Sequence, residues 1–438
     1  MTTPRPKFAW RAIFLASSGN FLEMYDFIVF GFYASAISKT FFPSRDPFAA
    51  LLLTFATFGA GFLMRPIGAI VLGAFIDRRG RRVGLLFTLA LMAAGTLTIA
   101  VMPPFLRIGA AAPFLVLIGR LVQGLSAGVE VGGVSVYLSE IAPARQKGFF
   151  VAWQSASQQV AVMFAAILGM GLSSTLSPSA MLAWGWRIPF LLGCLLIPFI
   201  FLARQRLPDT PGFAERTRTP SPTEIFRTLL AAWPVVLVGT MLATMTTVSF
   251  YLITAYTPTF GATVLNLSPF AALTVTLCVG VSNFILLPAM GALSDRIGRR
   301  PLLIGATIVS LLTSYPALLW LVSAPSFGRL LAVELWLSLV YAAYNGALVV
   351  ILTEIMPADV RTSGFSLAYS LATAIFGGST PALCTLVIHE TGNKAAPGLW
   401  LSGAAFMSLI AALVVTRFER PSSREPAQSV GVEQSGRA

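Results

Sequence analysis

The feature that most constrains this chain is a series of apolar blocks that covers most of its 438 residues. Each block has about 20 residues, the length that a helix needs to cross the hydrocarbon core of a bilayer. Only 11% of the residues are charged, whereas a soluble domain has about 25%. Nothing in the sequence supplies a polar outer face for a soluble helical bundle of this size. The sequence therefore predicts an all-α, multi-pass membrane protein.

We count twelve such blocks and expect twelve transmembrane helices. Their approximate ranges are 12–36, 50–76, 83–103, 112–138, 148–172, 188–204, 229–257, 268–292, 301–322, 328–352, 362–388 and 397–417. The first block carries acidic residues and no small-residue cleavage site follows it. We therefore expect it to stay in the protein as a helix and not to be removed as a signal peptide.

Two ten-residue stretches about half the chain apart are closely similar. They read GAFIDRRGRR from Gly73 and GALSDRIGRR from Gly291, and the pair SEIAPARQKGF and TEIMPADVRTSGF falls in equivalent loops. This duplication predicts two parallel six-helix halves with a binding site between them near the membrane midplane. We expect the halves at 1–203 and 229–420, a cytoplasmic linker at 204–228 and a cytoplasmic tail at 421–438.

The basic residues predict the orientation. If both termini are cytoplasmic, most of the 30 Lys and Arg residues fall on the cytoplasmic side, as the positive-inside rule requires. The net charge of +13 then reflects membrane topology and not a nucleic-acid surface, because no basic and aromatic residues interleave. No GxxxxGK[ST] loop, metal-ligand cluster or nucleophile–His pair is present. We expect a monomeric, ion-coupled transporter without enzyme activity, catalytic residues, cofactor or bound metal.

Several motifs carry a family resemblance. The GxxxDRxGRR loops and GRLVQG (Gly119–Gly124) resemble signatures of the major facilitator superfamily. The stretches SGNFLEMYDF, QGLSAGVEVGGVSVYLSEIA and EIMPADVRTSGFSLAYSLATAIFGG resemble the metabolite–proton symporter family, and within it the bacterial citrate and tricarballylate carriers. The resemblance covers about residues 17–380. It implies halves that rock against each other, with a tricarboxylate and protons as the transported species.

The duplicated loop itself is expected to be a cytoplasmic gate motif and not a substrate site. We expect Asp77 and Asp295 to cap or pair with neighbouring helix ends and to stabilise the outward-facing state. The other members of the motif are Gly73, Arg78, Gly80, Arg81, Gly291, Arg296, Gly298 and Arg299.

Charges inside the membrane are the strongest functional signals, because each is costly there unless it is paired or hydrated. Arg65 precedes Asp77 by twelve residues; at about 1.5 Å per residue this is roughly 18 Å, the middle of a ~30 Å core. Asn283 holds the equivalent position before the second loop. A guanidinium binds a carboxylate through two parallel hydrogen bonds, so this pair predicts an anionic substrate. The alternative is that Arg65 only pairs with an acid on the first helix.

Glu23 and Asp26 are candidate proton carriers. They are three residues apart and lie on one side of the first helix, and Glu23 is as deep as Arg65. A carboxyl at that depth favours its neutral form unless a cation is adjacent, so it can load and release a proton. The alternatives are a fixed ion pair with Arg65 and, for Asp26, a packing hydrogen bond.

The fourth block presents Arg120, Gln123 and Glu130 along one stripe at helical spacing. Arg120 and Gln123 are candidate substrate ligands, and Glu130 is a further candidate for proton coupling. Small residues surround Glu130, so we expect a neighbouring helix to pack closely there. A structural ion pair within the same half is the alternative for both charges.

Amides and hydroxyls complete the predicted site. Gln154 and Gln158 are i, i+4 partners in the fifth block, and Tyr341, Tyr344 and Asn345 lie on one turn of the tenth; inter-helix hydrogen bonding is the alternative for the two glutamines. Glu334 is expected to be a rim residue. Alternative functions are symport of a dicarboxylate or 2-oxoglutarate, symport of a zwitterion of the betaine–proline type and, less favoured, drug export, a transporter-like nutrient sensor or a channel.

Overall fold

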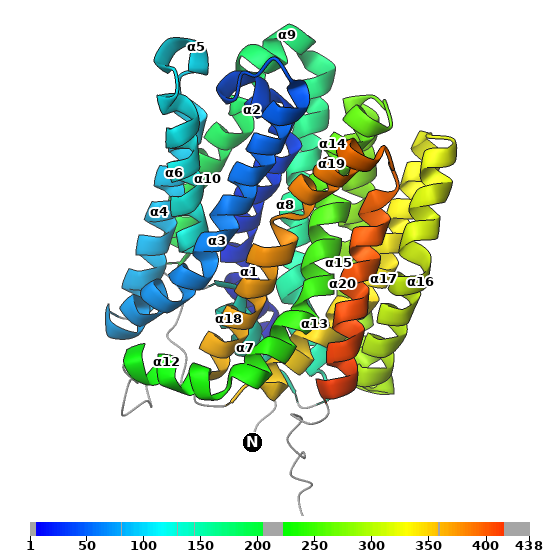
Figure 1. Ribbon diagram of the computed structural model, residues 1–438. Helices are drawn as coiled ribbons and strands as arrows, with labels where there is room; N and C mark the ends of the chain where they lie inside the picture. The colour runs from blue at the N-terminus through cyan, green and yellow to red at the C-terminus, as the bar shows by residue number, and fades with distance from the viewer. Residues whose placement is uncertain are drawn as a thin grey trace, which may run out of the picture.

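A computed structural model describes residues 6–79, 81–128, 130–143, 145–204, 222–357 and 360–415. The described residues form a bundle of long helices that run in alternating directions (Figure 1). Ten of these helices are long and apolar enough to cross a membrane, and an eleventh span results if the bent pair Asn20–Phe32 and Ala34–Phe41 is counted as one. The apolar stretch Leu86–Val101 is shorter. The predicted all-α architecture of many membrane-length helices is confirmed.

The first part of the chain, here the N-terminal half, runs up and down through the bundle. It consists of α1 (Pro6–Phe32), α2 (Ala34–Phe41), α3 (Pro47–Arg79), α4 (Arg81–Val101), α5 (Phe105–Ile108), α6 (Ala111–Ala127), α7 (Glu130–Ile141), α8 (Lys147–Thr175), α9 (Pro178–Ala180), the π-helix η1 (Met181–Gly185) and α10 (Arg187–Arg204). The first apolar block is therefore not one straight helix, because the chain bends by 67° between α1 and α2.

The second part, here the C-terminal half, repeats this path with π-helical segments in two of its spans. It consists of α12 (Pro222–Ala231), α13 (Trp233–Tyr251), η2 (Leu252–Tyr256), α14 (Thr257–Thr259), η3 (Phe260–Val264), α15 (Pro269–Ile297), α16 (Arg299–Ser323), α17 (Phe327–Ile355), α18 (Arg361–Ala372), η5 (Thr373–Gly377), α19 (Thr380–Thr391) and α20 (Ala396–Val414). Helix α12 lies across the end of the bundle at which α1 begins, the lower end in Figure 1.

Glycines bring the two halves together at both ends of the bundle. Near the lower end, a Cβ on Gly291 of α15 would overlap the carbonyl oxygen of Gly148 on α8. Near the upper end, a Cβ on Gly31 of α1 would lie 3.1 Å from the carbonyl oxygen of Ala255 in η2. Because small residues let helix backbones approach within a membrane, these positions hold the halves in contact above and below the middle of the bundle.

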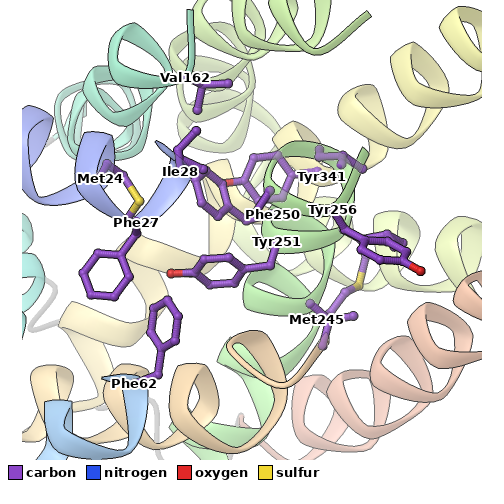
Figure 2. Packing of buried hydrophobic residues seen from close by; sticks show 14 of the residues in the cluster. Met24, Phe27, Ile28, Phe62, Val162, Met245, Phe250, Tyr251, Tyr256 and Tyr341 are labelled. Carbon is purple, nitrogen blue, oxygen red and sulfur yellow. The ribbon is translucent and has the colours of Figure 1, made fainter. Parts of the chain in front are cut away.

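An aromatic cluster connects the halves between these two contacts. Phe27 of α1 and Phe62 of α3 have ring centroids 4.6 Å apart, and Phe62 lies 5.0 Å from the ring of Tyr251 on α13. Figure 2 shows these three rings around one space, with the Tyr251 hydroxyl directed toward the two phenylalanines. The buried arginines described below stack on the same phenyl rings.

Candidate functional site

Close packing of α3 on α6 places two arginines side by side. A Cβ on Gly124 would overlap the carbonyl oxygen of Gly61, and one on Gly128 would overlap that of Arg65. Only glycine allows this approach, which is the small-residue packing of membrane helices. The expected close packing of the fourth block is thus present, centred on Gly124 and Gly128. Arg65 and Arg120 are consequently held on adjacent helices, and both are buried.

Arg65 forms a buried ion pair with the first helix. Its Nη2 atom lies 2.8 Å from Oε1 of Glu23, and the exposed fractions of the two side chains are 2% and 1%. The guanidinium also lies over the rings of Phe27 and Phe62, at 4.6 and 4.8 Å from their centroids. Pairing offsets part of the desolvation cost of a buried charge, and loss of one partner would leave the other uncompensated, so Glu23 and the aromatic faces support the arginine at this depth.

Arg120 is held in a different way. Its guanidinium lies over the rings of Phe27, Phe30 and Phe58, at 4.5, 4.6 and 5.1 Å, and its Nη1 donates to Oε1 of Gln123 at 2.8 Å. Within the described residues, its Nε and Nη2 atoms have no hydrogen-bond partner. Phe27 is therefore shared by two guanidinium groups, of which Arg65 is ion-paired with Glu23 and Arg120 is in no salt bridge within the described residues.

Asp26 belongs to a hydrogen-bond chain that starts at Arg120. Gln123, which accepts from Arg120, donates through Nε2 to Oγ1 of Thr96 on α4 at 3.0 Å. Thr96 in turn bonds to Oδ2 of Asp26 and also lies 2.9 Å from the carbonyl oxygen of Met92. A carboxyl and a cation on two different helices are thus linked through an amide and a hydroxyl.

The amides of α8 contact α1. Asn20 donates through Nδ2 to the carbonyl oxygen of Gln154 at 3.0 Å, and its Oδ1 lies 3.5 Å from Nε2 of Gln158. Gln154 also accepts a hydrogen bond from Ser155 at 2.8 Å. In the part of the chain that the structure describes, both side-chain polar atoms of Gln159 lack a hydrogen-bond partner. Gln154 and Gln158 therefore serve partly as inter-helix contacts, while Nε2 of Gln154 and the whole amide of Gln159 have no hydrogen-bond partner among the described residues.

The C-terminal half supplies neutral polar groups. Oδ1 of Asn345 accepts from Thr246 at 2.7 Å, and Asn283 is fully buried with neither polar atom hydrogen-bonded among the described residues. Tyr341 is buried beside Phe250, with ring centroids 6.3 Å apart. The Tyr344 hydroxyl donates to the carbonyl oxygen of Leu242 at 2.6 Å. Tyr344 is therefore held against α13, whereas the two asparagines keep donors unused.

The second copy of the duplicated loop joins the halves at the lower end. The carboxylate of Asp295 accepts from the backbone N–H groups of Gly148 and Phe149, at 2.9 and 3.0 Å, and so caps the first turn of α8. Arg299 lies 3.6 Å from Asp295 and 3.2 Å from Glu354. This is the expected type of helix-end contact, made across the two halves.

The first copy of the loop cannot be compared with the second. Gly80 lies outside the described residues. Nothing is described of the surroundings of Gly73 or of the side chains of Asp77, Arg78 and Arg81. The same holds for the side chain of Glu130, whose backbone begins α7. Arg296 and Gly298 lie at the end of α15, where Gly298 has a φ of +94°, a conformation that favours glycine.

Several residues of this polar core were not singled out from the sequence. Asn20 and Thr96 carry inter-helix hydrogen bonds, but Asn and Thr are ordinary residues of membrane helices. Phe27 links the two arginines, although an apolar residue in an apolar helix gives no signal. The expectation that Glu334 is a rim residue is wrong, because its exposed fraction is 6%.

Comparison with known proteins fits this fold and core. The model of the "Sugar (and other) transporter" family matches residues 12–220 and 214–419. A citrate-proton symporter of Salmonella typhi is 57% identical over 410 residues, which cover 93% of this chain and 94% of that protein. One of Klebsiella pneumoniae is 58% identical over 406 residues, covering 93% and 91%. The crystal structure of a D-xylose-proton symporter superposes with a TM-score of 0.73 at 20% identity, covering 95% and 98%.

These findings define the class of protein. The chain belongs to the sugar (and other) transporter family, and it is a multi-pass membrane protein. It shares its fold with a major facilitator superfamily proton:xylose symporter, which superposes with a TM-score of 0.73 at 19% identity. The members of this family and the relatives named above are transporters and not enzymes. The buried arginines and carboxyls are accordingly considered below as groups that bind and release a cargo.

Proposed function

We propose that this protein takes up citrate together with protons by alternating access. The observation that carries the proposal is a pair of buried guanidinium groups, those of Arg65 and Arg120, which both lie over the ring of Phe27. Two fixed cations in a low-dielectric environment fit a substrate with several carboxylates. The two relatives at 57% and 58% identity are named citrate-proton symporters, which supports citrate as the cargo. Tricarballylate, which lacks the hydroxyl of citrate, fits the same cations.

Arg120 is the proposed first contact of the substrate, because among the described residues it forms no salt bridge and its Nε and Nη2 atoms have no hydrogen-bond partner. Arg65 is already bound to Glu23, so a second carboxylate of the substrate must compete with an internal one. Gln123, Gln154, Gln158 and Asn283 are the proposed polar ligands around these cations, with Tyr341, Tyr344 and Asn345 as ligands from the C-terminal half. Of these, Asn283 has both polar atoms free for the role in the described structure.

Asp26 is the proposed main proton carrier. The single hydrogen of the Thr96 hydroxyl faces two acceptors, Asp26 and the carbonyl oxygen of Met92. A protonated Asp26 would donate to Oγ1 of Thr96, and the Thr96 hydrogen would then be free for the Met92 carbonyl oxygen. Glu23 has a second role in the proposal, since its protonation would release Arg65 for the substrate. Glu130 remains a candidate from sequence alone.

The topology completes the proposal. Twelve spans in two six-helix halves, 1–203 and 229–420, would place both termini, the linker 204–228 and the tail 421–438 in the cytoplasm. The lower end of the bundle is then cytoplasmic, and the Asp295 cap on α8 would close the path to the cytoplasm in the outward-facing state. We place the protein in a bacterial inner membrane and expect a monomer to be sufficient for transport.

Uptake into proteoliposomes tests the function directly. Purified protein is reconstituted, an inward proton gradient is imposed, and radiolabelled citrate is followed with tricarballylate, 2-oxoglutarate and betaine as competitors. We expect gradient-driven citrate uptake that tricarballylate blocks and that Arg65→Gln abolishes. Arg45→Gln, which removes an exposed cation between α2 and α3, is the matched control and should transport normally. Gradient-driven uptake of 2-oxoglutarate or betaine without citrate uptake would overturn the tricarboxylate assignment.

A further inference from the structure

Glu334 is a buried carboxyl that the proposed mechanism does not use. It lies on α17 seven residues after Phe327, where the helix begins at the upper end, and its exposed fraction is 6%. Its Oε1 atom is 2.9 Å from Oγ1 of Thr257. Its Oε2 atom has no hydrogen-bond partner among the described residues, nor does the hydroxyl of Ser338 one turn further along. A carboxyl inside a membrane protein is a functional-site signal by default.

Within the described residues, Glu334 has no cationic partner that would compensate for an ionised carboxylate, because no Lys or Arg side chain there forms a salt bridge with it. Arg329 on the same helix donates instead to Trp320 and Ser323 on α16. The titratable groups on the neighbouring elements near this end are Tyr256 of η2, Cys278 of α15 and Tyr315 of α16, and each of these side chains is ordinarily neutral near pH 7.

The hydrogen bonds of Thr257 indicate which form of Glu334 fits. Oγ1 of Thr257 is 2.9 Å from Glu334 and 3.1 Å from the carbonyl oxygen of Leu252, but a hydroxyl has only one hydrogen to donate. With an ionised Glu334, the Thr257 hydroxyl can donate to only one of these two acceptors at a time. With a protonated Glu334, the carboxyl donates to Thr257, and Thr257 donates to Leu252. Both contacts are then satisfied.

The same arrangement occurs once more in the other half. Thr96 stands between Asp26 and the carbonyl oxygen of Met92, as Thr257 stands between Glu334 and that of Leu252. In both cases a threonine hydroxyl joins a buried acid to a helix carbonyl. The Leu252 carbonyl belongs to the π-helix η2, a helix type that occurs frequently at functional sites.

We infer that Glu334 is a second proton-binding site of the transporter, located in the C-terminal half near the upper end of α17, with the Thr257 hydroxyl as the hydrogen-bond partner of its protonated carboxyl. The inference rests on the proposed proton-coupled transport and adds a site to it. Proton binding at Glu334 is an acid–base equilibrium at an Oε atom: the carboxyl O–H bond forms as one O–H bond of a hydronium ion breaks and leaves a neutral water, and release to water is the reverse step. No group other than the carboxyl and that water exchanges a proton.

The first experiment measures the coupling ratio. The full chain is reconstituted in proteoliposomes, and the number of protons per citrate is obtained from the membrane potential at which net citrate flux reverses. Glu334→Gln retains the acceptor for Thr257 but cannot titrate, so the ratio is expected to fall by about one proton per citrate. Glu390→Gln, an exposed acid-to-amide change on α19, should keep the wild-type ratio. An unchanged ratio in a transporting Glu334→Gln variant would overturn the inference.

The second experiment does not require citrate transport. Infrared difference spectra between wild type and Glu334→Gln, recorded on the purified proteins near neutral pH, should contain the C=O band of a protonated carboxylic acid. This band is present in the wild type and lost in the variant. Thr257→Val should shift this band to higher frequency, because the carboxyl loses its hydrogen-bond partner. A wild-type protein that shows the band but takes up no citrate would overturn the proposed function and leave the proton site standing. A spectrum identical in wild type and Glu334→Gln would overturn the proton site.

Discussion

The polar core of the N-terminal half and that of the C-terminal half use different chemistry on a similar helical path. The first holds Glu23, Asp26, Arg65 and Arg120, all buried. The second presents Asn283, Asn345 and hydroxyl groups at mid-bundle, with its acid, Glu334, nearer the upper end. Neutral groups move through a low-dielectric interior at little electrostatic cost, whereas charges need partners throughout. On the proposed function, we expect the N-terminal half to hold the anion through its two arginines and the C-terminal half to close over it.

The largest effect that would test this comparison comes from breaking the ion pair of the N-terminal half. Arg65→Gln leaves Glu23 without its cation, so the free energy of unfolding should fall by about 3–5 kcal/mol and citrate uptake should cease. Arg65→Gln combined with Glu23→Gln should recover most of the stability but no transport. Denaturation in detergent and proteoliposome uptake measure the two quantities. A stable, transporting Arg65→Gln single variant would contradict the anion site.

A smaller effect is expected when Arg120 is replaced by lysine, which keeps the positive charge but lacks the planar guanidinium group. Arg120→Lys removes the planar group that lies over Phe27, Phe30 and Phe58 and the fork that binds a carboxylate at two points. Loss of hydrogen bonds to a charged group, about 1.5–3 kcal/mol, corresponds to a KM for citrate roughly 10- to 100-fold higher. Arg45→Lys on the exposed loop serves as control. A wild-type KM in Arg120→Lys would remove Arg120 from the substrate site.

The smallest effects are expected from the neutral residues, and here two asparagines should behave differently. Asn283→Ala removes a group without a hydrogen-bond partner in the described structure, so stability should hold while KM rises a few-fold, as for one neutral hydrogen bond. Asn345→Ala removes the acceptor of Thr246 and should lower the free energy of unfolding by about 1 kcal/mol. Equal stability losses in both variants would show that Asn283 has a structural role instead.

The sequence was sufficient to predict the membrane-spanning architecture, because a bilayer leaves so few ways to satisfy the backbone of an apolar chain. It also singled out Arg65, Arg120, Glu23 and Asp26 as candidate site residues, because charged side chains are rare in apolar helices. It left open that Arg65 binds Glu23, since pairing depends on how helices rotate against each other. The bend between α1 and α2 was likewise not predicted, because no proline marks it.

Polar residues that are common in membrane helices were beyond the reach of sequence reasoning. Thr96 and Thr257 look like any other threonine until the acids on neighbouring helices are placed next to them. Glu334 was misplaced for a related reason. Its distance from the start of α17 predicted the rim, but the packed π-helical segment η2 covers it, and π-helical turns leave no clear pattern in a single sequence.

The cap that Asp295 makes on α8 has a consequence for mutational tolerance. Its partners are the backbone N–H groups of Gly148 and Phe149. The cap therefore depends on the side chain of Asp295 but only on the backbone of the two donors. Phe149 can change to any residue except proline without losing its donor, whereas Gly148 is fixed by its approach to Gly291. Substitution of Phe149 therefore preserves this hydrogen bond, whereas any replacement of Asp295 that lacks a side-chain acceptor removes both bonds to α8.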